Sequence, residues 1–458
     1  MLSKMKKVVM KNLIVLVLFG FLFITFLALP ACGKPNETHD RLLIYYHEMD
    51  QGMCDSVSEA FNNLYPDTEL ILEMVGINND PDSFLQYTER VLNEIKAGHG
   101  PDVIFINHLL NTNVYNMVEA NYFLDLDGFF RSDNEFNPEN YIMPALDAGI
   151  YSEYRYLIPL LIETQFFLSS RSVLKQIGFD ESITTSGTRF YSELAKCLPV
   201  LEYNGTPESV FIFKNYIYFL FSKHGFRIVD YENKTFIADK NKVKEFIDAY
   251  KICYRYIQEM PDITYRGSQE NYEAVQSNKI LFPSVTGPTG AFDLISLIAT
   301  KDEPVLIPLP NQSGGVDARS VYTLAANANT VNPSAAYGFI KLMLDRGAMS
   351  CTRISSSLPV NRELLVECID TAVQNTPSTG ILGFERGEIS AEMIDQYWRL
   401  IDEIDHCAVV SLTFQSYGED EIFLETMMPY LQDENDFEQC FKDFKERLEV
   451  ALQNTAIY

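Results

Sequence analysis

Two polar runs in the amino-terminal third of the sequence carry side chains that could bind a small molecule. His47, Glu48 and Asp50 follow an apolar run at 42–46, and Asn107 and His108 follow another at 102–106. Carboxylate, amide and imidazole groups form hydrogen bonds with hydroxyl-rich solutes, and imidazole together with carboxylate also suits zinc. The residue types therefore indicate a site for a small polar solute, with a metal ion as the alternative.

The elements that must position these side chains follow an alternating pattern. The runs at 42–46, 69–75 and 102–106 indicate buried strands, and the stretches between them place apolar residues at helical spacing. This order is typical of an α/β fold with a mostly parallel sheet flanked by helices. Ligands of such sheets bind outside the carboxyl ends of the strands. We therefore expect His47 and His108 to face the same crevice.

Charge and missing motifs exclude several classes of function. The 458 residues carry a formal net charge of −27, and the first 31 contain four lysines and no acidic residue, so the rest carries −31. Such a surface repels phosphate backbones and anionic headgroups, which argues against nucleic-acid binding and against peripheral membrane binding. The sequence has no G-x-S-x-G, H-E-x-x-H or G-x-G-x-x-G motif. It predicts no enzyme, no cofactor and no resident metal.

The amino terminus resembles the signal of a bacterial lipoprotein. Lysines precede an apolar stretch at 13–29, and Pro30-Ala31-Cys32-Gly33 follows it like a lipobox. We expect cleavage after residue 31, lipidation of Cys32 and a polar tether at 32–40. The protein would then sit on the extracytoplasmic face of a bacterial cell membrane, held by acyl chains. The alternative is an uncleaved transmembrane anchor.

Six motifs in order across 42–362 resemble the family 1 extracellular solute-binding proteins of ABC importers, the maltose-binding-protein-like class. They lie at 61–67 (F-N-N-L-Y-P-D), 97–104 (A-G-H-G-P-D-V-I), 122–126 (Y-F-L-D-L), 156–159 (Y-L-I-P), 331–340 (V-N-P-S-A-A-Y-G-F-I) and 357–362 (S-L-P-V-N-R). The resemblance implies a two-lobe fold, each lobe a mostly parallel sheet flanked by helices, with an interlobe hinge. It also implies a monomer that captures a small-molecule solute and delivers it to ABC transporter permease subunits.

The resemblance also places lobe boundaries along the chain. The amino-terminal lobe would take 41–157 and 322–350, and the carboxy-terminal lobe would take 158–321 and 351–458. A non-transport role, as a ligand sensor for a membrane kinase, keeps the same fold and stays open. So does a cargo other than sugar.

The family's ligand-contacting loops place the remaining candidates. Tyr46, His47 and Glu48 follow the first strand, and Asn107 and His108 follow the third. Glu163, next to Thr164, stands four residues after Pro159, where the family has a carboxylate for sugar hydroxyls. The family's G-P-W turn corresponds to Gly287-Pro288-Thr289.

The aromatic platforms of the family are altered in this sequence. Thr289 replaces one aromatic residue and Ile106 replaces another, and Trp398 is the one tryptophan of the chain. Sugars stack on aromatic rings, so stacking would have to come from Tyr45, Tyr46, Phe292 or Trp398, or the ligand is not a linear glucan. Each candidate also has an ordinary interpretation: an ion pair for Glu163, loop histidines for His47 and His108, and helix packing for Trp398.

Overall fold

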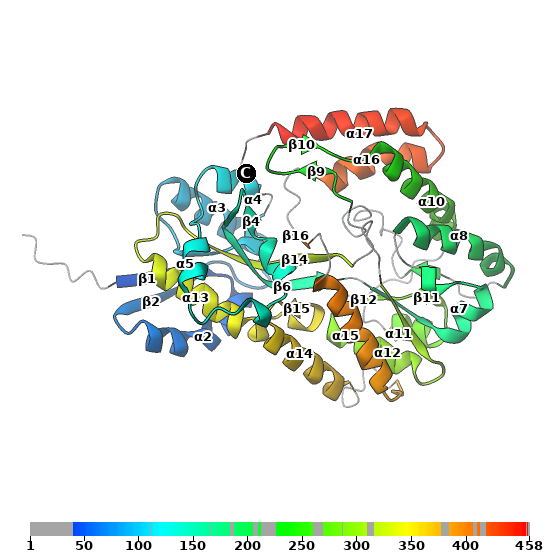
Figure 1. Ribbon diagram of the computed structural model, residues 1–458, viewed down its shortest axis with the longest axis horizontal. Helices are drawn as coiled ribbons and strands as arrows, with labels where there is room; N and C mark the ends of the chain where they lie inside the picture. The colour runs from blue at the N-terminus through cyan, green and yellow to red at the C-terminus, as the bar shows by residue number, and fades with distance from the viewer. Residues whose placement is uncertain are drawn as a thin grey trace, which may run out of the picture. The chain divides into compact units, whose positions relative to one another are not determined.

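Figure 1 shows the computed structural model of the chain. The structure describes residues 40–110, 112–164, 166–183, 187–204, 209–211, 226–259, 269–285, 287–308, 316–376, 384–405, 410–412, 418–454 and 456. The predicted signal peptide, Cys32 and nearly all of the tether lie outside these residues. Among the described residues no helix has both the length and the apolar character needed to cross a membrane.

The strands alternate with helices along most of the chain. The strands are β1 Asp40–Tyr46, β2 Thr68–Met74, β3 Val103–Phe105, β4 Ile150–Tyr151, β5 Tyr154–Arg155, β6 Leu157–Thr164, β7 Phe166–Ser170, β8 Ser209–Phe211, β9 Val229–Asp230, β10 Thr235–Phe236, β11 Ile280–Phe282, β12 Ser284–Val285, β13 Pro304–Pro308, β14 Ala318–Ala326, β15 Leu358–Pro359 and β16 Val410–Leu412.

The α-helices occur in both the amino-terminal and the carboxy-terminal parts of the chain. They are α2 Gln51–Leu64, α3 Ser83–Lys96, α4 Val114–Glu119, α5 Asp127–Ser132, α6 Met143–Asp147, α7 Arg171–Ile177, α8 Gly187–Asn204, α10 Lys240–Glu259, α11 Gln269–Gln276, α12 Pro288–Ile298, α13 Pro333–Asp345, α14 Arg362–Asn375, α15 Ala391–Asp405, α16 Glu419–Leu431 and α17 Phe437–Leu452. Short 3-10 helices are η1 Glu48–Asp50, η2 Ile106–His108, η3 Pro138–Asn140, η4 Glu181–Ile183, η6 Gly347–Ser350 and η7 Ile354–Ser356.

The main sheet begins as the sequence predicts and then becomes mixed. Its strand order is β15-β6-β14-β3-β1-β2, with β16 paired to β14. β1 and β3 run parallel, with Ile44 opposite Val103. β14 runs antiparallel to both β3 and β6. The expectation of a mostly parallel sheet is therefore wrong in detail, because β14 returns from a distant part of the chain and enters the sheet in the opposite direction.

The pairing of β6 with β14 is irregular around a proline. Pro159 lies within β6 and faces Thr323, and the register shifts between Ser320 and Tyr322 and again between Tyr322 and Thr323. Proline has no N–H to donate, so within sheets it is found at edges or at bulges. The shifts adapt β14 to this proline while every residue of β6 except Glu163 stays buried.

Smaller sheets accompany the main sheet. β7 pairs antiparallel with β12 and β13, and β8 pairs parallel with β11. Buried apolar side chains form two clusters, a larger one on the main sheet and a second one that includes Phe167, Phe190, Phe246 and Phe441. Helices α8, α10, α16 and α17 contribute to the second cluster (Figure 1). The described part of the chain is thus a mixed α/β protein with two hydrophobic clusters.

Candidate functional site

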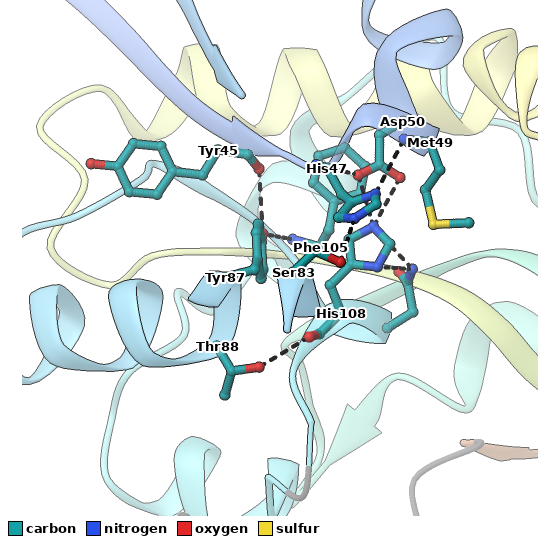
Figure 2. A network of polar contacts seen from close by, with 10 residues as sticks. Tyr45, His47, Met49, Asp50, Ser83, Tyr87, Thr88, Phe105 and His108 are labelled. Atoms are coloured by element: carbon teal, nitrogen blue, oxygen red, sulfur yellow. Dashed lines mark hydrogen bonds and ion pairs between the residues drawn. The ribbon is translucent and has the colours of Figure 1, made fainter. Parts of the chain in front are cut away.

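His47 connects the first strand to the first turn of helix. β1 ends at Tyr46, and His47 is the N-cap of η1. Its Nδ1 accepts the backbone N–H of Met49 at 3.2 Å, and the Asp50 carboxylate accepts the backbone N–H of His47 at 2.8 Å. This reciprocal capping turns the chain sharply at the end of β1. It also places the Asp50 side chain under the turn (Figure 2).

His108 reaches the same carboxylate from the third strand. η2 follows β3 directly, and His108 Nε2 lies 2.7 and 2.9 Å from the two carboxylate oxygens of Asp50. Asp50 is 0% exposed and His108 is 1% exposed. The structure therefore brings His47 and His108 together, with ring centroids 5.5 Å apart. It buries both rings, and the crevice that they were expected to face stays a prediction.

Aromatic rings close the space around both imidazoles. Phe84 stacks on His47 at a centroid distance of 4.6 Å, and Ser83 Oγ lies 3.1 Å from His47 Nε2. Besides His47, the rings within about 6 Å of His108 are those of Phe84, Tyr87, Phe105 and Tyr322. The imidazoles are thus buried, and their neighbours Tyr46, Glu48 and Asn107 are half-exposed.

Burial sets the charge of His47. Desolvation lowers the pKa of His47, the neighbouring His108 lowers it further, and the carboxylates of Asp50 and Glu48 oppose the shift. A neutral His47 with its proton on Nε2 donates to Ser83 and accepts from Met49, so both ring nitrogens are satisfied.

Lowering the pH from 7 to 5 is expected to cost stability through His47. Its pKa is lower in the folded state than in the unfolded state, so the unfolded chain binds more protons below about pH 6.5 and is favoured there. The free energy of unfolding should fall by up to about 1.4 kcal/mol per pH unit from this group. Urea unfolding of the wild type and of His47→Asn, which keeps a capping acceptor, measures the difference. If the free energy of unfolding changes with pH in the same way in both proteins, the prediction is contradicted.

Glu48 forms hydrogen bonds with the loop that follows β2. Its carboxylate accepts the backbone N–H of Asn78 at 2.5 Å, and its own N–H donates to the carbonyl of Gly76 at 3.2 Å. Gly76 has φ +96°, and a Cβ there would lie 2.8 Å from the His47 ring. Glycine is therefore required at this turn, which packs directly on the histidine.

Glu163 and Thr164 extend β6 rather than interrupting it. Glu163 lies opposite Arg319 on β14, and Arg319 Nη2 donates to its carboxylate at 2.9 Å. Thr164 Oγ1 donates to the carbonyl of Asp317 at 2.9 Å and is buried. The structure thus shows Glu163 in an ion pair, and Arg319 is 40% exposed at its side chain, so water screens the pair.

Gly287 allows two segments to approach within van der Waals distance. It is the N-cap of α12, Pro288 occupies the first helical position and Thr289 is exposed. A Cβ on Gly287 would lie 2.3 Å from the carbonyl carbon of Ser356. The loop before β15, which pairs with β6, therefore packs against the start of α12.

Trp398 lies on α15, far from the histidine pair in the sequence. It is half-buried and packs against the larger hydrophobic core, and its neighbour Tyr397 is fully buried against Phe166 and Phe292. Helix packing, the ordinary interpretation, accounts for this placement.

Sequence reasoning did not find the central role of Asp50 or the contributions of Ser83 and Tyr322. The signal for Asp50 was its position three residues after a capping residue, which is the spacing of a capping box. Within the described residues, Asn107 Oδ1, Tyr322 OH and Ser357 Oγ are buried and have no hydrogen-bond partner. Only the folded chain shows which polar atoms are left without one.

The metal alternative finds no support in the described ranges, where no three His, Cys, Asp or Glu side chains gather as a metal site. Glu48 binds a backbone amide and Glu163 binds Arg319. The four candidate ligands of that alternative, His47, Glu48, His108 and Glu163, therefore have other partners.

A surface hollow of about 680 Å³ lies away from all of these residues. It lies between the segment 236–240 and α17, and its lining includes Lys240, Lys442 and Lys445. It shares no lining residue with the predicted site. Lys240 pairs with Glu438 inside it, so it is not a uniformly basic surface.

The sequence matches a known protein-family model. Residues 55–350 match the family model for the bacterial extracellular solute-binding protein. Comparison with curated protein sequences gives no match.

Solved structures match over nearly the whole chain. The sugar-binding protein MalE from Xanthomonas citri has a TM-score of 0.61 at 12% identity, covering 90% of this chain and 97% of its own. A family 1 extracellular solute-binding protein from Alicyclobacillus acidocaldarius has a TM-score of 0.59 at 14% identity, covering 90% and 98%.

A third structure was determined with a ligand. The GacH receptor of Streptomyces glaucescens, described without ligand and in complex with acarbose and an acarbose homolog, has a TM-score of 0.53 at 16% identity. The match covers 91% of this chain and 100% of GacH. At these identities the likeness shows the fold, which is the two-lobe α/β fold expected from the sequence.

Proposed function

The chain belongs to the family of bacterial extracellular solute-binding proteins, and from this premise we propose that it captures a carbohydrate between two lobes and delivers it to an ABC transporter permease. Membership of the family places the protein outside the cytoplasm. The observation that carries the choice of a carbohydrate is that similar structures include a receptor solved with acarbose and a protein described as sugar-binding.

The proposed contacts are the half-exposed groups at the strand ends. Tyr46, Glu48 and Asn107 border the buried histidine pair, and Thr289 is exposed at the start of α12. Hydroxyl-rich solutes are bound by carboxylates, amides and hydroxyls with aromatic surface nearby. His47, His108 and Thr164 are buried. Glu163 would offer its second carboxylate oxygen.

The lobes proposed from the sequence remain 41–157 with 322–350 and 158–321 with 351–458. β6 and β14, which pair along seven positions, would carry the chain across the hinge. Closure of two lobes around a solute is a common motion of such folds. A binding protein of this kind performs no chemistry on its cargo and works as a monomer.

A matching sugar is expected to stabilise the protein strongly. At a solute concentration 100-fold above Kd, binding adds about 2.7 kcal/mol to the free energy of unfolding. Thermal unfolding in the presence of malto-oligosaccharides, manno-oligosaccharides, cyclic glucans and acarbose tests this. Asn107→Ala is the control, because the shift should shrink when a contact is lost. No shift with any of these sugars would count against a carbohydrate cargo.

Anchoring through Cys32 is the second part of the proposal. Two acyl chains and a thioether-linked glycerol would hold the protein at the outer surface of the membrane, since one chain alone binds only reversibly. Cys32→Ser is expected to release the protein from the membrane fraction into the medium or periplasm. Intact mass spectrometry of the detergent-extracted wild type would show the added lipid, and an unmodified Cys32 at the mature terminus would contradict the anchor.

A further inference from the structure

Tyr231 connects the two hydrophobic clusters. Its ring is half-buried, packs against both clusters and stacks on the ring of Tyr115, with centroids 4.4 Å apart and 13° between the planes. Tyr115 lies on α4 in the proposed amino-terminal lobe. The Tyr231 hydroxyl donates to Glu419 of α16 at 2.6 Å, in the proposed carboxy-terminal lobe. The stacked pair therefore joins the proposed lobes at a point outside the hinge strands β6 and β14.

The loop between β9 and β10 adds charged contacts to α4. Residues 231–234 form this loop, and Lys234 at its end has φ +50°. Its Nζ donates to Glu119 Oε2 at 2.6 Å and to Asn116 Oδ1 at 3.2 Å. The Tyr151 hydroxyl donates to Glu119 Oε1 at 2.8 Å. Burial raises the pKa of Glu119, but the hydrogen bonds from Lys234 and Tyr151 lower it further, so the carboxylate is ionised at neutral pH.

Asn116 contacts the β9–β10 hairpin and the end of the chain at the same time. It is buried, and its Nδ2 donates to the carbonyls of Asn454 at 3.1 Å and Ala456 at 2.9 Å. Figure 1 shows the carboxyl terminus beside α4. A further contact comes from Glu232, whose carboxylate accepts the backbone N–H of Ser152 at 2.8 Å. Two segments of the proposed carboxy-terminal lobe thus meet one helix and one turn of the other lobe.

We propose that these contacts hold the two lobes together in the arrangement that binds the solute, and that they thereby set the affinity for it. The inference rests on the proposed function, since it takes from there the two lobes and a solute bound between them. We call the contacts the interlobe interface, and its members are Tyr115, Asn116, Glu119, Ser152, Tyr231, Glu232, Lys234, Asn454 and Ala456. A lobe movement that carries α4 away from the β9–β10 hairpin must break this interface.

The interlobe interface consists of contacts that are weak one by one. The Glu119 side chain is 37% exposed, so water screens its ion pair with Lys234, and a screened pair contributes little. Stacking of two tyrosine rings is also a modest contribution. Weak contacts that break together favour one arrangement of the lobes and leave the other accessible. A solute can therefore enter while the interface is broken, and the interface helps the lobes to close over it.

Two sets of substitutions break the interface from opposite lobes. The double variant Lys234→Gly with Tyr231→Ala removes the amine and the stacked ring, and glycine adopts the positive φ at 234 without strain. Asn116→Asp keeps the acceptor for Lys234 and removes the donor to the carbonyls of 454 and 456. Thr235→Ala is the matched control, because this exposed residue lies on the same hairpin and outside the interface.

Distances between the lobes measured without any solute test the proposal. The full chain in detergent carries spin labels on unnatural amino acids at Leu64 of α2 and Ile252 of α10, which are both exposed. Double electron–electron resonance gives the distribution of distances between the two labels. We expect one main distance, that of the structure, in the wild type and in Thr235→Ala. We expect an additional longer distance in the double variant and in Asn116→Asp.

The outcomes separate this inference from the proposed function. A distribution that stays unchanged in the folded double variant overturns the inference. A main distance in the wild type longer than that of the structure also overturns it, and this holds even if the double variant does not fold. Failure of the sugar screen contradicts the carbohydrate cargo and leaves the distance result standing. For any sugar that binds, the double variant should weaken affinity about three- to tenfold, because a smaller share of the protein is then in the binding arrangement. Tighter binding would overturn the inference.

Discussion

Gly287→Ala is expected to lower the free energy of unfolding by about 3 kcal/mol, the upper end of the usual cost of overpacking. The added methyl group would lie 2.3 Å from the carbonyl carbon and 2.5 Å from the Cα of Ser356. Both atoms belong to the backbone, so the overlap cannot be relieved by turning a side chain. The start of α12 or the loop at 353–357 must move. Urea denaturation followed by circular dichroism measures the loss.

Gly128→Ala is the matched control for this substitution. A Cβ on Gly128 meets no atom within 4 Å, and the residue lies in α5. Alanine favours a helix over glycine, so this variant is expected to be neutral or slightly stabilised, by up to about 1 kcal/mol. Equal stabilities for the two variants would show that Gly287 is not a close-approach position. Because Thr289 lies two residues further on, Gly287→Ala should also weaken binding of any sugar found in the screen.

His108→Leu is expected to be still more damaging, with a loss of about 3–5 kcal/mol. Leucine fits an aromatic surrounding, but it removes the donor that faces the Asp50 carboxylate at 2.7 Å. The carboxylate is fully buried and would keep its charge without a counterpart, or take up a proton at a cost. Removing one partner of a buried pair leaves the burial of the other polar group without a compensating interaction, which lowers stability. Equilibrium unfolding in urea at pH 7 gives the number.

Two controls separate charge from shape at this position. His99→Leu makes the same exchange at a side chain that is 63% exposed, and it should change stability by less than about 0.5 kcal/mol. The double variant Asp50→Asn with His108→Leu removes the charge together with its partner and should recover part of the loss. A His108→Leu protein as stable as the wild type would show that Asp50 is not held as a carboxylate by this pair.

Local patterns in the sequence were sufficient to predict the strands β1, β2 and β3 of the main sheet. The β1, β2 and β3 strands lie within two residues of the predicted runs, because apolar runs and helical spacing act over short distances. The mixed direction of the sheet was not predictable in the same way. It depends on β14, whose pairing with β3 joins Leu324 to Phe105 across more than 200 residues.

In the candidate site, too, features set by local sequence were predictable and contacts between distant residues were not. The strand-end rule brought His47 and His108 together correctly, since parallel strands end at one edge of a sheet. It did not show that Asp50 binds His108 or that Arg319 binds Glu163, which are partners 58 and 156 residues apart. Whether Tyr46, Asn107, Thr289 and Trp398 contact a solute stays a prediction. For the first three, the sequence pattern predicts only that they lie near the ends of strands or helices.

The position of β14 between β3 and β6 decides when the chain can fold. Until residue 326 has been synthesised, β3 has no partner on that side and β6 lacks its longest ladder. Contacts between residues so far apart in sequence slow folding, because a long loop must close before they contribute. The main sheet can therefore be completed only late in synthesis, after β14 has been made. That delay suits a protein that must be threaded through a membrane before its main sheet closes.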